Sequence, residues 1–548
     1  MTSIIYEKRS FNHDELSSID SIYLNNYPIV YILYNKKKRP TAYIGQTVQA
    51  KRRMTNHFKN PQRKVLAETI LIGHEEFNQS ATYNIETNLI NYFIADNRYR
   101  LQNVSQTSEK QIHNYFRKDY YNQELFNEVW EKLRQENIVD EKIETLANKD
   151  LFKLSPYKEL SEKQLEIKNN ILEYCKQNIS KNHNHVFLIE GDAGTGKSVV
   201  LSSLFNTIQD YANDNSTSLA NTENYLLVNH GEMIKTYQTI ASSLPNLKKK
   251  SFMKPTSFIN KMDKASEKAD IVLVDEAHLL LSKEDAYNNF RYQNHLEEII
   301  KRSKVTIVIF DPKQVLKIKS YWNKDLLQQI TKNYSTTTFS LEDQFRIDAS
   351  PEIPKWIDRF VEKKLTPIPQ LKNEKFELKI FENSDNLKDA IINNNKKYGL
   401  SRIVSTFDYI HKKDGSLYYV DEDGLNMPWN ITKNNKTWAE EADTIREVGS
   451  IYTVQGFDLN YVGVILGPSI SYDDTNEQLL IDTSKYKDTE AFRTRKDLSY
   501  EENEQAKEDI ILNSINILLK RGIKGLYIYA TDPKLRSKLL SLQGDENT

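Results

Sequence analysis

One short segment constrains the fold of this chain more than any other: residues 191–198, with the sequence GDAGTGKS. It follows an apolar run, VFLIE, and precedes a helix-like run, SVVLSSLFNTI, which is the strand, loop and helix order of a phosphate-binding loop (P-loop, or Walker A motif). Gly191, Gly194 and Gly196 allow main-chain N–H groups to surround phosphate oxygens, and the helix adds its positive N-terminal end. The segment therefore predicts a parallel α/β sheet with a nucleotide phosphate site at its edge.

The side chains around this loop have separate expected roles. Lys197 is expected to contact the β- and γ-phosphates and Ser198 to ligate Mg²⁺, with Thr195 also in the nucleotide-binding set. A second apolar run, DIVLVDEAH (the Walker B position), carries Asp275 to its C-terminal end, where ligands bind in α/β sheets. Asp275 is expected to hold Mg²⁺ through water, and Glu276 to polarise the attacking water. The predicted cofactors are ATP and Mg²⁺.

Recurring apolar runs predict the organisation of the chain. HVFLIEG, NYLLVNH, DIVLVDE and VTIVIFD alternate with helix-like segments, and a second series follows after about residue 375: ELKIFE, SRIVSTF, VGVILG and GLYIYAT. Runs rich in Val, Ile and Leu between helices are typical of parallel sheets covered on both faces. We predict an α/β chain with an N-terminal extension, a small α/β domain, a helical connector and two P-loop-type domains, over 1–27, 28–105, 106–155, 156–375 and 376–548. A hairpin or loop is expected within 410–440.

Composition narrows the functional classes. The chain has 548 residues, of which 39% are hydrophobic, so several domains can each bury a core. Mean hydropathy is -0.66 and no run approaches about 18 apolar residues, so no membrane partner is expected. The single cysteine, Cys175, excludes an intramolecular disulfide, and with no secretory signal it favours the cytoplasm. Net charge is -1, yet residues 35–64 hold ten Lys/Arg and no Asp or Glu, a local footprint for phosphate.

The order of motifs over about 160–540 resembles that of a superfamily 1-type helicase ATPase. More narrowly, it resembles the bacterial DUF2075 family, also described as Schlafen group 3-like DNA/RNA helicase domains. The resemblance rests on GDAGTGKS, VDEAH, IFDPKQ, LEDQFRI, GSIYTVQGFDLNYVGVILG and KRGIKGLYIYATD. It implies tandem RecA-like domains over 156–375 and 376–548. It assigns adenine reading to Gln164, γ-phosphate sensing to Asp311 and Gln314, phosphate contact to Arg346 and Arg521, and the most distinctive motif to Thr453, Gln455 and Gly456.

This chain departs from the family at three positions. Asp458 stands where the family more often has Glu, Asn516 where it usually has Arg, and Lys520 where it favours Thr. The two arginines also have a physical argument of their own, because a guanidinium can bind two phosphoryl oxygens at once. If Arg346 or Arg521 reached across a domain cleft, ATP hydrolysis and cleft closure would be coupled, as a motor requires.

The N-terminal segment TAYIGQTVQAKRRMTNHF, residues 41–58, resembles the GIY-YIG nuclease family, which includes intron-homing endonucleases and the nuclease subunit of bacterial excision repair. The resemblance covers about 28–104. Tyr-Ile-Gly is intact at 43–45, whereas Ile-Val-Tyr at 29–31 replaces Gly-Ile-Tyr. It assigns catalytic places to Tyr31, Tyr43, Arg53, His57, Glu86 and Asn103, with Glu86 as the metal ligand.

The same residues make chemical sense without the family. Phosphodiester hydrolysis needs an activated water, a cation near the developing charge and usually a metal. Tyr31 and Tyr43 could relay or accept the water's proton if a metal or an arginine lies nearby. Arg53 and His57 are four residues apart and share a helix face, where Arg53 could hold the scissile phosphate. Glu86 is an oxygen ligand suited to Mg²⁺ or Mn²⁺.

These observations predict an ATP-dependent nucleic-acid motor fused to a metal-dependent endonuclease. The expected partner is nucleic acid, DNA rather than RNA, with an oligomer or a defence-partner protein also possible. By analogy with similar fusions, we hypothesise an antiphage or restriction-like role. Two alternatives stay open: an ATP-gated switch that controls the nuclease without translocation, and a motor whose residues 1–105 bind without cutting.

Overall fold

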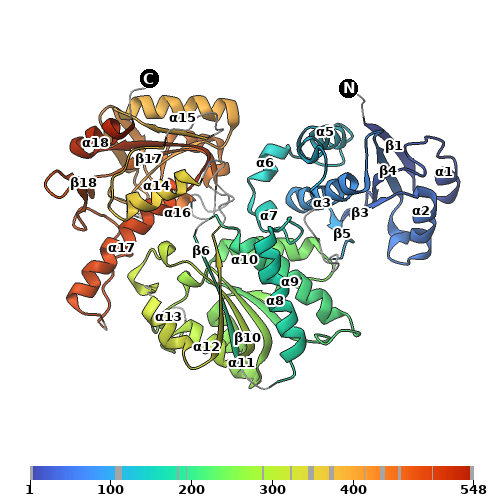
Figure 1. Cartoon of the computed structure of the whole chain (residues 1–548), viewed down its shortest axis with the longest axis horizontal. Helices are drawn as coiled ribbons and strands as arrows, with labels where there is room; N and C mark the ends of the chain where they lie inside the picture. The colour runs from blue at the N-terminus through green and yellow to red at the C-terminus, as the bar shows by residue number, and fades with distance from the viewer. Residues whose placement is uncertain are drawn as a thin grey trace. The chain divides into compact units, whose positions relative to one another are not determined.

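The computed structural model describes residues 4–104, 114–181, 184–192, 194–286, 289–320, 322, 324–342, 351–369, 376–412, 414–431, 438–454, 458–496 and 498–543 (Figure 1). The chain divides into two compact units. The first comprises Met1–Phe187, Ser198–Asp275 and Ile299–Val308, and the second comprises Leu188–Lys197, Glu276–Glu298 and Ile309–Thr548. The chain is mixed α/β, and several of its strand pairs are parallel.

The first unit begins with a five-stranded sheet of order β1-β4-β2-β3-β5. Its strands are β1 (Ile5–Ser10), β2 (Ile29–Tyr34), β3 (Thr41–Thr47), β4 (Glu68–Gly73) and β5 (Arg100–Leu101). The sequence of β2, IVYILY, is buried at every position, and this strand pairs antiparallel with both β3 and β4. The helices here are α1 (His13–Ser17), α2 (Ala50–Lys59) and α3 (Gln79–Asp96). Side chains that cap α3 set its ends, because Asn78 accepts the Ala81 N–H and Asn97 takes a left-handed conformation.

The sequence analysis predicted an N-terminal extension over 1–27, but from residue 4 onward this segment belongs to the N-terminal domain. Within this segment, β1 pairs antiparallel with β4 at the edge of the sheet. Phe11, Leu16 and Leu24 pack in the same apolar cluster as Tyr31. The charged sequence of β1, IYEKRS, hides this role, because an edge strand leaves half of its side chains in water.

The predicted connector is helical in its described part. It contains α4 (Lys118–Tyr120), α5 (Phe126–Gln135), α6 (Ile143–Ala147) and α7 (Asp150–Lys153). The helix α5 is amphipathic, since Phe126, Val129, Trp130 and Leu133 are all buried on it. The Trp130 ring lies 5.4 Å from the Tyr92 ring of α3, so the connector packs against the N-terminal domain.

A six-stranded sheet of order β11-β6-β10-β9-β7-β8 follows. Its strands are β6 (His185–Gly191), β7 (Asn224–Val228), β8 (Phe252–Met253), β9 (Ala269–Asp275), β10 (Ser303–Phe310) and β11 (Ser335–Leu341). β9 runs parallel to both β7 and β10, as the apolar runs predict. The helices of this region are α8 (Glu162–Asn178), α9 (Lys197–Asn213), α10 (Gly231–Ser243), α11 (Pro255–Ala265), α12 (His295–Lys301) and α13 (Lys324–Thr331).

The second unit contains a five-stranded parallel sheet of order β12-β20-β17-β13-β16. Its strands are β12 (Glu377–Ile380), β13 (Arg402–Ser405), β16 (Val448–Gly449), β17 (Leu459–Leu466) and β20 (Gly522–Ala530), so all four predicted runs of the second series are strands. The helices are α14 (Glu352–Val361), α15 (Ser384–Tyr398), α16 (Ile451–Val454), α17 (Tyr500–Leu519) and α18 (Pro533–Gln543).

Two short hairpins complete the second unit. The predicted hairpin within 410–440 is confirmed as β14 (Tyr419–Glu422) and β15 (Leu425–Pro428), which pair antiparallel. Gly424, at the turn, has a φ of 92°, which favours glycine. The other hairpin joins β18 (Ile470–Asp473) and β19 (Gln478–Ile481). Among the helices that the structure describes, none has both the length and the apolar character needed to cross a bilayer.

Candidate nucleotide and nuclease sites

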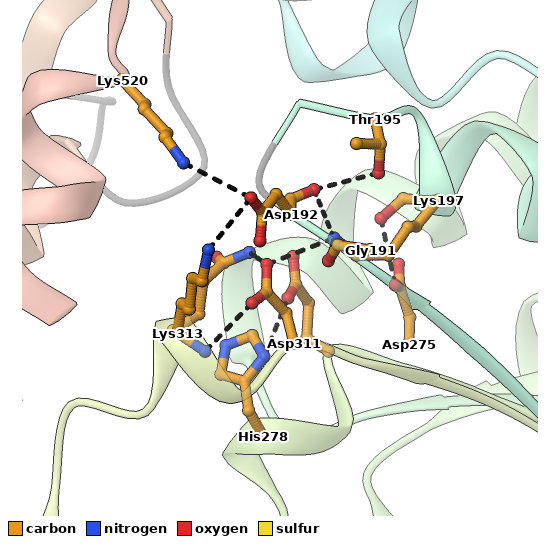
Figure 2. A network of polar contacts seen from close by, with 12 residues as sticks. Gly191, Asp192, Thr195, Lys197, Asp275, His278, Asp311, Lys313 and Lys520 are labelled. Atoms are coloured by element: carbon orange, nitrogen blue, oxygen red, sulfur yellow. Dashed lines mark hydrogen bonds and ion pairs between the residues drawn. The ribbon is translucent and has the colours of Figure 1, made fainter. Parts of the chain in front are cut away.

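The P-loop joins β6 to α9 (Figure 2). Gly194 and Gly196 have φ values of 89° and 75°, which residues with a side chain rarely adopt. A Cβ at Gly191 would lie 2.6 Å from the Leu341 carbonyl oxygen and 2.9 Å from the Thr195 hydroxyl. The three glycines thus let the main chain curl more tightly than other residues would permit.

Lys197 lies inside this curl and is nearly fully buried. Its ammonium donates to the carbonyl oxygens of Gly191, at 2.5 Å, and Asp192, at 2.7 Å. It also forms an ion pair with Asp311 at 3.2 Å, and the Gln314 amide donates to the same carboxylate oxygen at 2.7 Å. Lys197 and the two predicted γ-phosphate-sensing residues are therefore in one hydrogen-bonded group. A buried ammonium within a ring of main-chain turns is a suitable donor for phosphate oxygens.

Asp275 ends β9 with a fully buried carboxylate. One oxygen accepts the Ser198 hydroxyl at 3.0 Å, and the other accepts the Tyr237 hydroxyl at 2.6 Å. Ser198 and Asp275 thus place two hard oxygen ligands together, which is the donor type that Mg²⁺ prefers. The donor set of Ser198 and Asp275 therefore fits Mg²⁺. Tyr237, from α10, orients the Asp275 carboxylate through its hydrogen bond.

Glu276 follows directly and has a φ of 50°, an uncommon conformation for a residue with a side chain. Its carboxylate lies 3.3 Å from the imidazole Nδ1 of buried His278. Strained main chain of this kind is often found where a side chain must be held in a working position. The role of Glu276 in polarising the attacking water stays a prediction.

Gln164 has a local role that the sequence analysis did not give it. Its side-chain oxygen accepts the Ser161 N–H at 2.9 Å, while its own N–H donates to the Ser161 hydroxyl at 3.3 Å. This reciprocal capping box begins α8. Adenine reading by Gln164 stays a prediction.

The residues predicted from the later motifs are only partly described. Arg346, Gln455 and Gly456 lie outside the described residues. Arg521 precedes β20, is buried, and its guanidinium lies 3.8 Å from the Asp458 carboxylate. Thr453 lies in α16, where its hydroxyl accepts the Ser450 N–H at 2.8 Å.

The N-terminal sheet brings together four of its six predicted residues. Pairing of β2 with β3 sets Tyr31 opposite Gly45, and a Cβ at Gly45 would overlap the Tyr31 phenol. The Tyr31 hydroxyl lies 2.8 Å from His57 Nε2. Arg53 donates to the hydroxyls of Tyr31, at 3.1 Å, and Tyr43, at 3.4 Å. A glycine at position 45 is therefore needed to leave space for the Tyr31 side chain.

Burial controls protonation in this cluster. Burial and the neighbouring Tyr43 raise the pKa of the Tyr31 phenol, which outweighs the opposite effect of Arg53. Burial, followed by Arg53 and Arg63, lowers the pKa of His57 to about 4. His57 is therefore neutral at pH 7 and a weaker base than an ordinary histidine.

The remaining two predicted nuclease residues hold different positions. Glu86 is buried on α3, close enough to raise the pKa of Tyr31 electrostatically. Asn103 accepts the Ile44 N–H at 3.1 Å and donates to the Ile44 carbonyl at 2.8 Å, so it fixes the β3 main chain. Within the described part of the chain, no three His, Cys, Asp or Glu side chains group as metal ligands. Glu86 offers a metal one carboxylate, of a type suited to Mg²⁺ or Mn²⁺.

Comparison with known proteins identifies the family. The family model described as "Schlafen group 3, DNA/RNA helicase domain" matches residues 184–532. The chain belongs to this family. The predicted resemblance to Schlafen group 3-like helicase domains is thereby confirmed, and the P-loop, Asp275 and the second parallel sheet all lie within the matched range of this family member.

One curated relative and two solved structures are also similar. An uncharacterized protein of Saccharomyces cerevisiae (strain ATCC 204508 / S288c), YPL245W, is 40% identical over 413 residues, covering 70% of this chain and 90% of the relative. The Pif1 helicase from Candida albicans aligns at 13% identity over 71% of this chain and 98% of that chain, with a TM-score of 0.28. Domain III of the Thermotoga maritima replication initiation protein DnaA aligns at 14% identity over 37% and 70%, with a TM-score of 0.21.

The sequence analysis missed two residues of the N-terminal region. The Arg63 guanidinium lies 3.7 Å from the centroid of the Tyr43 ring. Tyr157, buried at the end of the connector, donates to the Asn103 carbonyl at 3.4 Å and is also hydrogen-bonded to Asn206 of α9. Tyr157 thus connects α9, the helix that begins at the P-loop, to Asn103. Only the basic stretch 35–64 gave a signal for Arg63, and nothing in the sequence singled out Tyr157 among 32 tyrosines.

Proposed function

We propose that this Schlafen group 3 family member is an ATP-driven nucleic-acid motor with RecA-like domains over 156–375 and 376–548. The observation that carries the proposal is the environment of Lys197, whose ammonium is held by two P-loop carbonyls and by Asp311. A loop of this kind surrounds nucleotide phosphates with its main-chain N–H groups, and its lysine contacts the β- and γ-phosphates. The family's helicase domain supports nucleic acid as the partner.

The chain's own residues account for the proposed hydrolysis. Lys197 exchanges its carbonyl partners for phosphate oxygens, and Ser198 and Asp275 would hold Mg²⁺, which supplies positive charge beside the phosphates. Glu276 orients and polarises the attacking water. Gln314, bonded to Asp311, responds to the terminal phosphate.

ATP turnover with and without nucleic acid tests the motor. The purified chain should hydrolyse ATP faster when single- or double-stranded DNA or RNA is present, and it should displace a strand. Turnover that no nucleic acid stimulates would reject the motor. Binding of no adenine nucleotide would reject the whole proposal.

For residues 28–105, joined by the edge strand β1, we propose a metal-dependent endonuclease of the GIY-YIG type that acts on DNA. The cluster of Tyr31, Tyr43, Arg53 and His57 supports it. Arg53 binds the scissile phosphate, neutral His57 holds the Tyr31 hydroxyl in place through their 2.8 Å hydrogen bond, and Glu86 would hold Mg²⁺ or Mn²⁺. Cleavage of plasmid DNA with either metal tests the proposal, and a chain that binds DNA without cutting would favour the non-cleaving alternative.

A second candidate function is an ATP-gated nuclease that does not translocate. The contacts of Tyr157 with Asn103 and Asn206 favour it, as does the Ser202 hydroxyl of α9, which donates to the Leu154 carbonyl at 2.6 Å. A non-hydrolysable ATP analogue separates the two candidates, because binding alone activates a switch whereas a motor needs turnover. The defence role, the cytoplasmic location and a protein partner stay predictions from the sequence.

A further inference from the structure

Four charged side chains form a closed ring beside the P-loop, part of which is drawn in Figure 2. The Lys520 ammonium lies 2.8 Å from Asp358 and 3.6 Å from Asp192. The Lys313 ammonium lies 3.2 Å from each of the same carboxylates. Each cation therefore contacts both anions, and the ring is neutral as a whole.

The four residues come from separate elements. Asp192 is the second residue of the P-loop motif, and Lys313 lies in the short helix η6 (Pro312–Gln314). Asp358 is on α14, and Lys520 is the C-terminal capping residue of α17. The ring thus connects the phosphate loop to the helix that leads into β20 of the second parallel sheet.

Burial makes Lys520 the most constrained member. Its side chain is 1% exposed, whereas those of the other three are partly open to water. A buried ammonium is costly unless it is paired, so the two carboxylates specify where Lys520 lies. Burial tends to raise the pKa of Asp192, but Lys520 and then Lys313 outweigh it, and the pKa is lowered. Asp192 therefore carries its negative charge at neutral pH.

That charge lies where an anion is expected to bind. The Asp192 carbonyl accepts from Lys197, the phosphate-binding lysine, so the Asp192 carboxylate belongs to the same turn of the loop. An uncompensated carboxylate there would repel a triphosphate, since like charges in a partly buried site are weakly screened. The next residue, Arg521, does not supply the compensation, because its guanidinium lies beside Asp458.

Building on the ATP site proposed above, we infer that Lys520 is a positioning residue for nucleotide binding. It neutralises Asp192 and so makes the affinity of the P-loop for a nucleoside triphosphate depend on the position of α17. Movement of α17 that withdraws Lys520 leaves Asp192 under-compensated and weakens triphosphate binding. The second parallel sheet would then control nucleotide release through a lysine, without a contact to the nucleotide itself.

A double-mutant cycle that neutralises each charge in turn tests this inference in the full-length chain. We expect Lys520→Met to weaken binding of a fluorescent ATP analogue about tenfold, because the Asp192 carboxylate loses the cation with the largest effect on it and keeps Lys313 and Lys197. Asp192→Asn should bind the analogue at least as tightly as wild type. The double variant should return to within about threefold of wild type, because the charge that needed Lys520 is gone. A double variant as weak as Lys520→Met would overturn the inference, since a purely structural lysine gains nothing from Asp192→Asn.

Controls keep the outcomes distinct. Lys534 and Asp474 form an exposed ion pair, so Lys534→Met and Asp474→Asn should leave nucleotide affinity unchanged. Thermal unfolding checks that each variant is folded. If Lys520→Met does not fold, Asp192→Asn decides alone, and weaker binding by that variant would contradict the inference. Wild-type chain that binds no analogue would reject the ATP site itself, whereas binding without rescue rejects only the role of Lys520.

Discussion

The P-loop and the N-terminal tyrosine cluster each contain a cation that we propose binds phosphate, but the surroundings of the two cations are opposite. Lys197 is buried, paired with Asp311 and bonded to two carbonyls. Arg53 is exposed and donates to two phenols, and among the described residues it forms no ion pair with a carboxylate.

This difference indicates how each site should respond to an anion. At the P-loop, phosphate must replace protein partners that already satisfy Lys197, so binding is an exchange and its free energy depends on the surrounding charges. At the cluster, a phosphodiester meets a cation with no competing carboxylate, so binding adds an interaction. The P-loop is thus suited to controlled binding and release, and the cluster to holding a passing phosphate.

Removing Lys197 should have the largest effect. We expect Lys197→Ala to lower ATP turnover by at least on the order of 100-fold, because it removes the ammonium that the Gly191 and Asp192 carbonyls hold within the loop. DNA cleavage without ATP should be unchanged if the two sites act separately. Phosphate release and plasmid cleavage, measured on one preparation, check both statements. Lys332→Ala, at an exposed position, is the control, and turnover by Lys197→Ala equal to wild type would refute the P-loop assignment.

The exposed arginine gives the converse test. Arg53→Ala should reduce DNA cleavage by about 100-fold while ATP turnover stays at the wild-type rate, since it removes the cation that bonds both tyrosine hydroxyls of the cluster. Arg52→Ala is a matched control, because this neighbour on α2 bonds Gln49 rather than either tyrosine. Equal loss in both variants would point to general phosphate attraction by the basic stretch and against a catalytic Arg53.

The protonation of His57 yields a smaller effect with a definite sign. Its pKa is about 4 in the fold, against an ordinary value of 6.5. Between these pH values the unfolded chain binds a proton that the folded chain excludes, so stability falls as the pH decreases from 6.5 toward 4. On going from pH 7 to pH 5, the wild type should lose about 2 °C more in melting temperature than His57→Gln. Equal losses would show that His57 is not buried as neutral imidazole.

The sequence predicted those parts of both sites that depend on local order along the chain. The P-loop, the β9 carboxylate and the apolar strands follow from short patterns, and the structure places each of them on the expected kind of element. Partners brought in by packing left no such pattern. Nothing in the sequence distinguishes Tyr237 on α10 or Asp358 on α14 from similar residues nearby. Only the folded chain brings Tyr237 to Asp275 and Asp358 to Lys520. The strand β1 was missed for a related reason. Its pairing with β4 depends on tertiary structure, and its charged residues do not form a recognisable strand pattern.

The smallest expected effect concerns the connection between the two sites. Tyr157→Phe removes one hydroxyl that donates to the Asn103 carbonyl, and Asn103 in turn fixes the β3 main chain. The ring remains to fill its buried place, so ATP turnover and nucleotide-free cleavage should stay within about twofold of wild type. If α9 communicates with the cluster through this hydroxyl, the ratio of cleavage with an ATP analogue to cleavage without it should fall about two- to fivefold. Tyr500→Phe, at an exposed tyrosine, serves as the control. An unchanged ratio would mean that the Tyr157 hydroxyl carries no energetic coupling between the P-loop and the tyrosine cluster. The two sites would then differ in the state of their cations and also act independently at this point.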